Sequence, residues 1–290
     1  ICLNSSFNPF NCLLALEYLG EDSYDIALII DADNIINSSY LAELNNAFAN
    51  PEVKVVQTHR AAKNLNTNMA YLDAISEEIN NSIFRLGHVN LGMSAALIGS
   101  GMAFEYTLFY KAMMSNTSVG GFDRVLEMKL LYHRVFFHYL PDTYVLDEKI
   151  QKTKNFYQQR RRWLSAQYYS LGEFVHHLLP AIRDRKWDFC DKLFQQASFS
   201  RLLLLGFTFI FSVCFSIWFP ALAYKWWGIF GLLLLALVIA IPRRFWKWRL
   251  VKAICFVPYS FLLMFFNLFR LKEANKKLSL IHISEPTRPY

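Results

Sequence analysis

This 290-residue sequence has few charged residues. It also lacks closely spaced cysteine pairs and an initiator Met. Only 18% of its residues are charged while 54% are hydrophobic, which excludes a disordered chain and a simple water-soluble domain. The five cysteines are scattered, with no CxxC pair and no Cys/His spacing, so we expect neither a disulfide framework nor a zinc site. The apolar excess is concentrated in the last third of the chain. We therefore predict a protein that is part soluble and part membrane-embedded.

The basic balance of the sequence points to one class of partner. Lys and Arg outnumber Asp and Glu by 30 to 23, which gives a net charge of +7. These basic residues cluster beside apolar runs rather than on a soluble surface rich in aromatic residues. We therefore expect contact with anionic membrane lipids and no binding of nucleic acid.

Both ends of the sequence look artificial. The chain opens at Ile1 without an initiator Met or a signal peptide, so we expect the native N-terminus to lie upstream. Residues 278–288 read LSLIHISEPTR, which resembles the translation of a transposase-based sequencing adaptor. We expect the tail 278–290 to be non-native and the protein to be truncated at both ends.

Residues 1–150 are predicted to form an α/β domain. The apolar run 25–34 has the length of a strand and ends in carboxylates, which is typical of a central parallel strand whose carboxyl edge binds ligands. On a long helix predicted at 66–85, Glu77 and Glu78 are expected to face solvent. Further periodic segments predict a helix at 37–50, a strand at 53–58, a glycine-interrupted strand at 96–104 and a helix at 123–133.

Residues 151–277 are predicted to meet and then cross the membrane. The segment 151–200 is mostly amphipathic, which favours helices at the membrane surface. The region 201–277 contains three apolar runs that can span a hydrocarbon core of about 30 Å, at 202–224, 226–241 and 253–269. A basic stretch at 242–252 marks a cytoplasmic loop. We therefore expect a multi-pass protein of the plasma (inner) membrane with a cytoplasmic α/β domain.

The first chemical motif is Asp31-Ala32-Asp33, at the end of the first apolar run. Two carboxylates one residue apart repel each other unless a cation neutralises them, and Mg²⁺ or Mn²⁺ prefers such oxygen ligands. A pyrophosphate leaving group needs the same neutralisation. We predict a Mg²⁺ or Mn²⁺ site here, and the alternative is a solvated acidic turn.

The second motif is a glycine turn, Gly120-Gly121, that leads into a helix carrying Asp123 and Glu127. A carboxylate near the N-terminus of a helix can act as a general base. Simple acidic capping of the helix is the alternative interpretation.

The third motif, QRRRW, runs from Gln159 to Trp163. An Arg side chain can bind phosphate oxygens through two hydrogen bonds, and a Trp ring can stack on the apolar face of a sugar. Three consecutive Arg residues can also be a solvated charge run. The QxxRW pattern just before predicted membrane spans is more specific than such a run.

In this order, the three motifs and the segment IGSGMAF (98–104) resemble the membrane-bound family 2 glycosyltransferases, the group of cellulose, chitin and hyaluronan synthases. The resemblance covers about Ile26 to Lys277. It implies a GT-A-type nucleotide-sugar-binding domain followed by interfacial helices and C-terminal transmembrane helices. It also implies a hexosyltransferase that inverts the anomeric centre. The donor would be a nucleotide-diphosphate sugar, expected to be a UDP-sugar, and the acceptor a growing polysaccharide or a lipid-linked molecule.

The resemblance also implies roles for individual residues. Asp33 would bind the divalent metal on the nucleotide diphosphate, and Asp31 would contact the donor sugar or ribose. Gln159, Arg162 and Trp163 would line the pyrophosphate and acceptor end of the active site.

The sequence departs from the family pattern at the catalytic base. Matching LEMKL to that pattern places Val125 where the catalytic carboxylate belongs, and valine cannot accept a proton. Glu127 matches the second acid of the pattern and Asp123 lies two residues before Val125, so either is a candidate for the base. Two alternatives stay open: a catalytically inactive glycosyltransferase-like membrane scaffold, and a transferase that adds a single sugar to a lipid.

Overall fold

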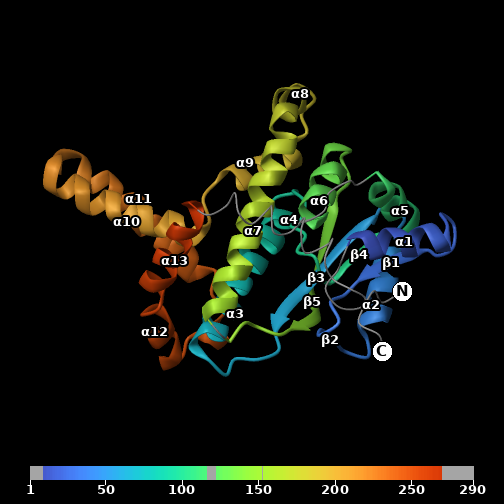
Figure 1. Cartoon of the computed structure of the whole chain (residues 1–290), viewed down its shortest axis with the longest axis horizontal. Coiled ribbons are helices and arrows are strands. Elements are labelled where there is room, and N and C mark those ends of the chain that lie inside the picture. The colour runs from blue at the N-terminus through green and yellow to red at the C-terminus, as the bar shows by residue number, and fades with distance from the viewer. Residues whose placement is uncertain (1–8, 116–121, 152, 270–290) are drawn as a thin grey trace.

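The computed structural model describes residues 9–115, 122–151 and 153–269 (Figure 1). The expected non-native tail and the glycine pair Gly120-Gly121 lie outside the described residues. In chain order the first half contains α1 (Pro9–Leu19), β1 (Ile26–Ile29), β2 (Ile35–Ile36), α2 (Tyr40–Phe48), β3 (Val55–Ala62), α3 (Asn68–Asn80), the π-helix η1 (Asn81–Gly87), α4 (His88–Asn90), β4 (Met102–Glu105), α5 (Tyr106–Met114), α6 (Phe122–Tyr132) and β5 (Phe137–Asp147). The second half contains α7 (Thr153–Phe174), the 3-10 helix η2 (Val175–His177), α8 (Leu178–Arg183), α9 (Trp187–Ala197), α10 (Arg201–Trp218), α11 (Pro220–Ile239), the 3-10 helix η3 (Arg243–Phe245), α12 (Trp248–Ile254) and α13 (Val257–Phe269).

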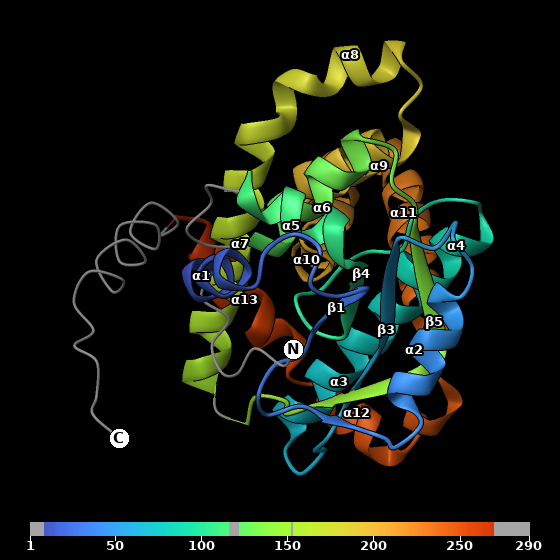
Figure 2. The same cartoon turned by 90° about the vertical axis from the view of Figure 1, so that its right-hand side faces the viewer.

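A mixed sheet organises the first half of the chain. Within the described residues its strand order is β1-β4-β3-β5-β2, with β3 and β5 parallel and every other pair antiparallel. Figure 2 shows β3 and β5 side by side, with α2 close to them. The register pairs Val55 of β3 with both Phe104 of β4 and Phe137 of β5. All three side chains are fully buried and lie in one apolar core cluster with residues of α5 and α6.

Two sequence-based expectations about this sheet are wrong. The strand in the run 25–34 is not a central parallel strand, because β1 lies at one end of the strand order and pairs antiparallel with β4. A short apolar run reports burial but not the direction of the neighbouring strand, so the sequence could not distinguish these cases. The strand expected at 96–104 forms only over β4, because Gly99 and Gly101 adopt positive φ angles of 78° and 67° that interrupt an extended chain.

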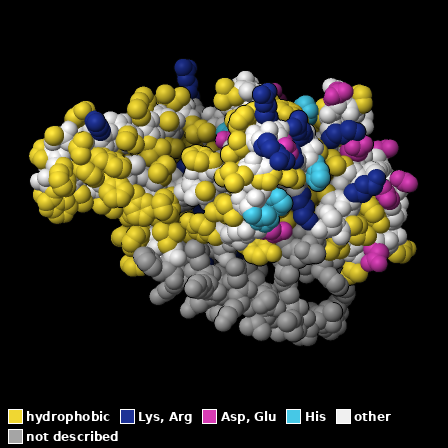
Figure 3. All heavy atoms as spheres, turned by 90° about the horizontal axis from the view of Figure 1, so that it is seen from above, with side chains coloured by type: hydrophobic (Ala, Val, Ile, Leu, Met, Phe, Trp, Pro, Cys, Tyr) yellow, Lys and Arg dark blue, Asp and Glu magenta, His cyan; other side chains and the backbone are white. Residues whose placement is uncertain are grey.

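The C-terminal region has three helical stretches long and apolar enough to cross a membrane. They are Arg201–Trp218, Pro220–Ile239 and Trp248–Phe266. The first two form the α10–α11 hairpin, which projects from the body of the molecule (Figure 1) and is covered with apolar side chains (Figure 3). In α11 only Ala223 is buried among the described residues. An apolar surface of this extent needs lipid around it, which indicates membrane association.

Helix α3 lies between the sheet and the membrane helices. The hydroxyl of Tyr71, on α3, donates a hydrogen bond to the carbonyl of Phe245, in η3, at 2.8 Å. The carboxylates of Glu77 and Glu78 are buried, with residue exposures of 5% and 4%, so the expectation that they face solvent is wrong. The helix forms as predicted, but the face that was expected to be exposed to solvent is covered by Arg85 and Arg244 from other segments.

The predicted surface helix around residue 190 packs more deeply than expected. On α9, Phe189 and Leu193 are buried in the core cluster with α6 residues, while Trp187 and Phe194 are exposed. The exposed pair leaves the prediction of a membrane-facing side in place, on one face of the helix only.

Candidate active site

Three carboxylates meet where β1 and β5 end. Asp31 and Asp33 follow β1, and Asp147 is the last residue of β5. One oxygen from each lies within 4.8 Å of the others. Asp147 was missed in the sequence because it reaches the site through strand pairing: β5 pairs with β2, which directly follows Asp33 and Asn34, and with β3. We call Asp31, Asp33 and Asp147 the acidic cluster.

The buried member of the cluster, Asp147, has charged partners on one side only. Its Oδ2 atom accepts from Arg60 at 2.8 Å and from Lys149 at 3.0 Å. The Arg60 and Lys149 side chains are themselves buried, with exposures of 10% and 3%. Burying three charged groups is tolerable only when they pair in this way. Its other oxygen, Oδ1, lies on the side of Asp33 and Asn34.

The electrostatics of Asp31 indicate that the cluster carries an excess of negative charge. Burial raises the pKa of Asp31, and this is opposed by the charge of Arg60 but reinforced by Asp147, Asp33 and then Asp123. A divalent cation would remove that repulsion, and three carboxylate oxygens are the ligand type that Mg²⁺ and Mn²⁺ prefer. The residues present therefore fit the cation predicted from the sequence, with Asp147 added to the expected pair.

The segment 98–101 lies against the cluster and is held by buried groups of β3. Gln57 Nε2 donates to the carbonyls of Ser100 at 3.1 Å and Gly101 at 3.2 Å, and its Oε1 accepts from the Ile98 amide at 3.1 Å. A Cβ atom at Gly101 would lie 2.6 Å from Thr58 Oγ1, so only glycine fits there. Gly101 therefore serves packing against β3, whereas Gly99 lies next to the carboxylate of Asp123.

Asp123 and Glu127 occupy different environments although both lie on α6. At Gly99 a Cβ atom would be 3.4 Å from Asp123 Oδ2, and Asp123 is close enough to Asp31 to raise its pKa. Glu127 is 2% exposed, and its Oε1 accepts from the Leu97 amide at 2.9 Å and pairs with Lys192 at 2.7 Å. Val125 is 1% exposed in the apolar core. Of these positions, only Asp123 presents a carboxylate on the side of the acidic cluster.

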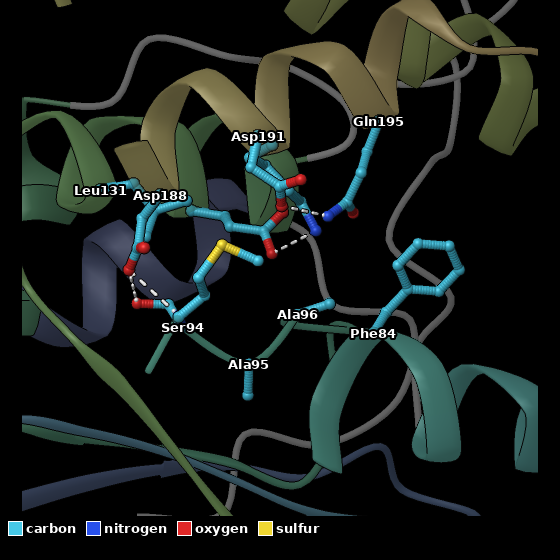
Figure 4. A pocket seen from close by; sticks show the side chains of 11 residues that line it. Phe84, Ser94, Ala95, Ala96, Leu131, Asp188, Asp191 and Gln195 are labelled. Atoms are coloured by element: carbon cyan, nitrogen blue, oxygen red, sulfur yellow. Dashed lines mark hydrogen bonds and ion pairs between the residues drawn. The ribbon is translucent and has the colours of Figure 1, made fainter. Parts of the chain in front are cut away.

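Behind Glu127 lies a small polar hollow between η1, α6 and α9, and Figure 4 shows how it is filled. Asp188 accepts from the amide of Ser94 at 3.0 Å and from its hydroxyl at 2.5 Å. Gln195 Nε2 donates to Asp191 at 2.6 Å. The Asp188–Ser94 bonds attach α9 to the loop that precedes β4, and the polar side chains of the hollow are already hydrogen-bonded to one another.

The third motif lies on α7. Arg160 pairs with Asp73 of α3 at 2.5 Å, and its guanidinium lies 4.7 Å from the centre of the Trp163 ring. Gln159 and Trp163 are half-buried, and Arg162 is exposed. Among the described residues, no hydrogen bond or ion pair joins Gln159, Arg162 or Trp163 to the cluster. The first arginine of the motif, Arg160, instead connects α7 to α3.

The sheet, the acidic cluster at its edge and the apolar helices that follow define a membrane-associated α/β protein with a candidate divalent-cation site. The chain belongs to glycosyl transferase family group 2, whose family model matches residues 26–270. This confirms the family that the motifs indicated and the expected fold class, a GT-A-type α/β domain followed by helices.

No match was found among curated proteins. Among solved structures, the chain is similar to the mannosyltransferase PcManGT from Pyrobaculum calidifontis in complex with GDP-Man and Mn²⁺. The identity is 15% and the TM-score is 0.38. The alignment covers 79% of this chain, which spans 64% of the length of that structure.

Proposed function

We propose that this protein is a membrane-bound, metal-dependent glycosyltransferase that uses a nucleotide-diphosphate sugar. The observation that carries the proposal is the acidic cluster of Asp31, Asp33 and Asp147, formed at the sheet edge of a family 2 chain. Mg²⁺ or Mn²⁺ bound there would neutralise the diphosphate of the donor as it leaves. Asp33, the exposed member of the cluster, is best placed to meet the donor, and Asp31 would contact its sugar or ribose.

Asp123 is the proposed general base. It would take the proton from an acceptor hydroxyl, whose oxygen forms a bond to the anomeric carbon while the bond from that carbon to the diphosphate breaks. Attack opposite the leaving group inverts the anomeric centre. Glu127 would act as a positioning residue, because its buried carboxylate already binds Lys192 and the Leu97 amide.

The α7 motif and the membrane helices supply the acceptor side of the proposal. Gln159, Arg162 and Trp163 would line the pyrophosphate and acceptor end, with the Trp163 ring stacking on a sugar. Helix α7 contacts α13 and is joined to α3 by the Arg160–Asp73 pair, which favours an acceptor that passes toward the membrane. The acceptor would be a growing polysaccharide or a lipid-linked sugar, the donor a UDP-sugar, and the location the plasma membrane with the sheet in the cytoplasm.

The test is nucleoside diphosphate release in membranes that contain the protein, measured across a panel of donors with Mg²⁺ or Mn²⁺. We expect one donor to give metal-dependent release, and Asp33→Asn and Asp123→Asn to abolish it. Asp142→Asn is the matched control, because Asp142 is exposed on the same strand as Asp147. Full activity of Asp123→Asn together with loss in Glu127→Gln would reverse the base assignment.

Val125 motivates a second candidate function, a catalytically inactive membrane scaffold. The apolar burial of Val125 means that α6 offers no carboxylate at the position the family pattern requires. Donor binding without turnover, detected as Mn²⁺-dependent retention of a nucleotide sugar with no release of diphosphate, would favour the scaffold over the enzyme.

A further inference from the structure

Asn34 lies between the acidic cluster and the segment 98–101. With its amide oxygen toward Ser100, that oxygen accepts from Ser100 Oγ at 2.5 Å. The amide nitrogen then lies 3.2 Å from Asp33 Oδ1 and 3.2 Å from Asp147 Oδ1. One side chain therefore touches two carboxylates of the cluster and the segment beside it.

Every polar hydrogen of the Asn34 and Ser100 side chains donates a hydrogen bond. An amide side chain offers two N–H donors and an acceptor oxygen, and Asn34 places one donor on each carboxylate. The Ser100 hydroxyl has one hydrogen, which it donates to Asn34, and its oxygen accepts from the Asp31 amide at 3.1 Å. An aspartate at position 34 could not donate, and a serine could donate only once. The bonding pattern thus requires an amide.

Ser100 is a rigid anchor for this junction. It is fully buried, and its carbonyl accepts from Gln57 of β3 at 3.1 Å. The neighbouring Gly101 carbonyl accepts from Thr58 Oγ1 at 3.0 Å. A displacement of the segment 98–101 would therefore be passed through Ser100 and Asn34 to the two carboxylates.

The geometry points to Asn34 as a positioning residue: we propose that it sets the Asp33 and Asp147 carboxylates at the spacing a divalent cation needs and, through Ser100, ties that spacing to the segment 98–101. The inference rests on the proposed metal site. Asn34 is not itself a ligand here, because its oxygen is committed to Ser100. Groups that orient metal ligands in this way typically change metal affinity by about 10- to 100-fold when removed.

The experiment measures Mn²⁺ binding by electron paramagnetic resonance on the purified full chain in detergent, with Mn²⁺ alone as the probe. Asn34→Leu keeps the shape of the side chain and removes its donors and acceptor, and we expect Mn²⁺ to bind about 10- to 100-fold more weakly. Ser100→Ala should weaken binding less. Because both act through one junction, the double variant should bind no more than about threefold more weakly than Asn34→Leu. Asn46→Leu, at an exposed position on α2, is the control and should leave binding unchanged.

A second readout separates positioning from simple misfolding. In Asn34→Leu the Mn²⁺ concentration for half-maximal diphosphate release should rise about 10-fold or more, while kcat at saturating Mn²⁺ recovers. Equal Mn²⁺ affinity in Asn34→Leu and wild type, or a kcat that stays low at saturating Mn²⁺, overturns the inference. Asp33→Asn tests the site itself: if it binds Mn²⁺ like wild type, the metal site and this inference both fail. If only Asn34→Leu is normal, the inference alone fails.

Discussion

Acidic side chains gather in two regions of this molecule, and the two regions are built in opposite ways. On α3, each of three carboxylates faces an arginine from another segment: Asp73 pairs with Arg160 of α7, Glu77 with Arg85 of η1, and Glu78 with Arg244 of η3. In the acidic cluster, the carboxylates face one another, and within the part of the chain that the structure describes only Asp147 forms ion pairs.

This difference in charge pairing distinguishes a structural contact, on α3, from a binding site, at the acidic cluster. These pairs join α3 to α7, to η1 and to the loop between the membrane helices, and they are complete without any ligand. The cluster keeps a surplus of negative charge that the protein does not neutralise, which costs stability unless a cation binds. Arg60 lies between the two regions, because its charge interacts with Asp147, Glu77 and Asp31. It limits the surplus without removing it.

The sharpest test of this comparison removes one acid from the cluster. Asp33→Asn should lower the rate of sugar transfer about a thousandfold, because a metal contributes several kcal/mol to the transition state and about 1.4 kcal/mol is tenfold. In the absence of metal the same variant should be as stable as wild type or more so, since one repelling charge is lost. Diphosphate release and thermal melting in detergent measure the two effects. A clear loss of stability without metal would show that the acidic cluster, like the α3 pairs, stabilises the fold.

Removing an acid from α3 should have the opposite signature. Glu77→Gln leaves the Arg85 guanidinium buried without its counter-charge, and breaking such a pair costs about 3–5 kcal/mol. Chemical unfolding in detergent measures this, with exposed Glu52→Gln as the control. A stability within about 0.5 kcal/mol of wild type would contradict the role assigned to the pair.

The Arg244–Glu78 pair, on the membrane side of α3, should contribute less to the free energy of unfolding than the Glu77–Arg85 pair. Arg244 pairs with Glu78 but is 52% exposed, so solvent screens the pair. Arg244→Met should cost about 1 kcal/mol or less, since Glu78 also accepts from His59. Arg243→Met, a change at the neighbouring exposed arginine, is the control. An effect as large as that of Glu77→Gln would mean that the loop is held much more tightly than its exposure indicates.

The two regions should also respond to acid in opposite directions. Burial and neighbouring carboxylates raise the pKa of Asp31 above 3.8, so without metal its ionised form destabilises the fold, and stability is regained as pH falls through that raised pKa. Burial alone would raise the pKa of Glu77, but Arg85, Lys149 and Arg60 together lower it below 4.5. The stability from Glu77 is therefore present above pH 4.5 and lost as pH falls through its lowered pKa.

Thermal melting as a function of pH checks this sign difference, and the changes should be the smallest of the set. Asp31→Asn should flatten the rise of stability as pH falls through the raised pKa of Asp31. Glu77→Gln should flatten the fall that follows at lower pH. The same slope in both variants would erase the distinction between the regions.

Much of this organisation could be predicted because it depends on local patterns. The apolar run before Asp31 and the helical spacing after residue 66 are set by side chains that are neighbours in the chain. The three apolar helices were predicted because length and hydropathy suffice, although the second begins at Pro220 and includes Lys225 rather than starting after it. The roles of Gln159, Arg162 and Trp163 stay predictions.

What the sequence determined by itself is the family, the α/β character of the first half, the paired carboxylates Asp31 and Asp33, and the membrane-spanning composition of the last third. Only the tertiary structure decided that Asp147 joins the pair, that Glu127 is engaged by Lys192, and that the α3 acids are buried against arginines. The physical reason is distance along the chain. Periodicity reports which face of an element is apolar, whereas the partner of a charge is chosen by strand pairing and helix packing between residues that lie tens of positions apart.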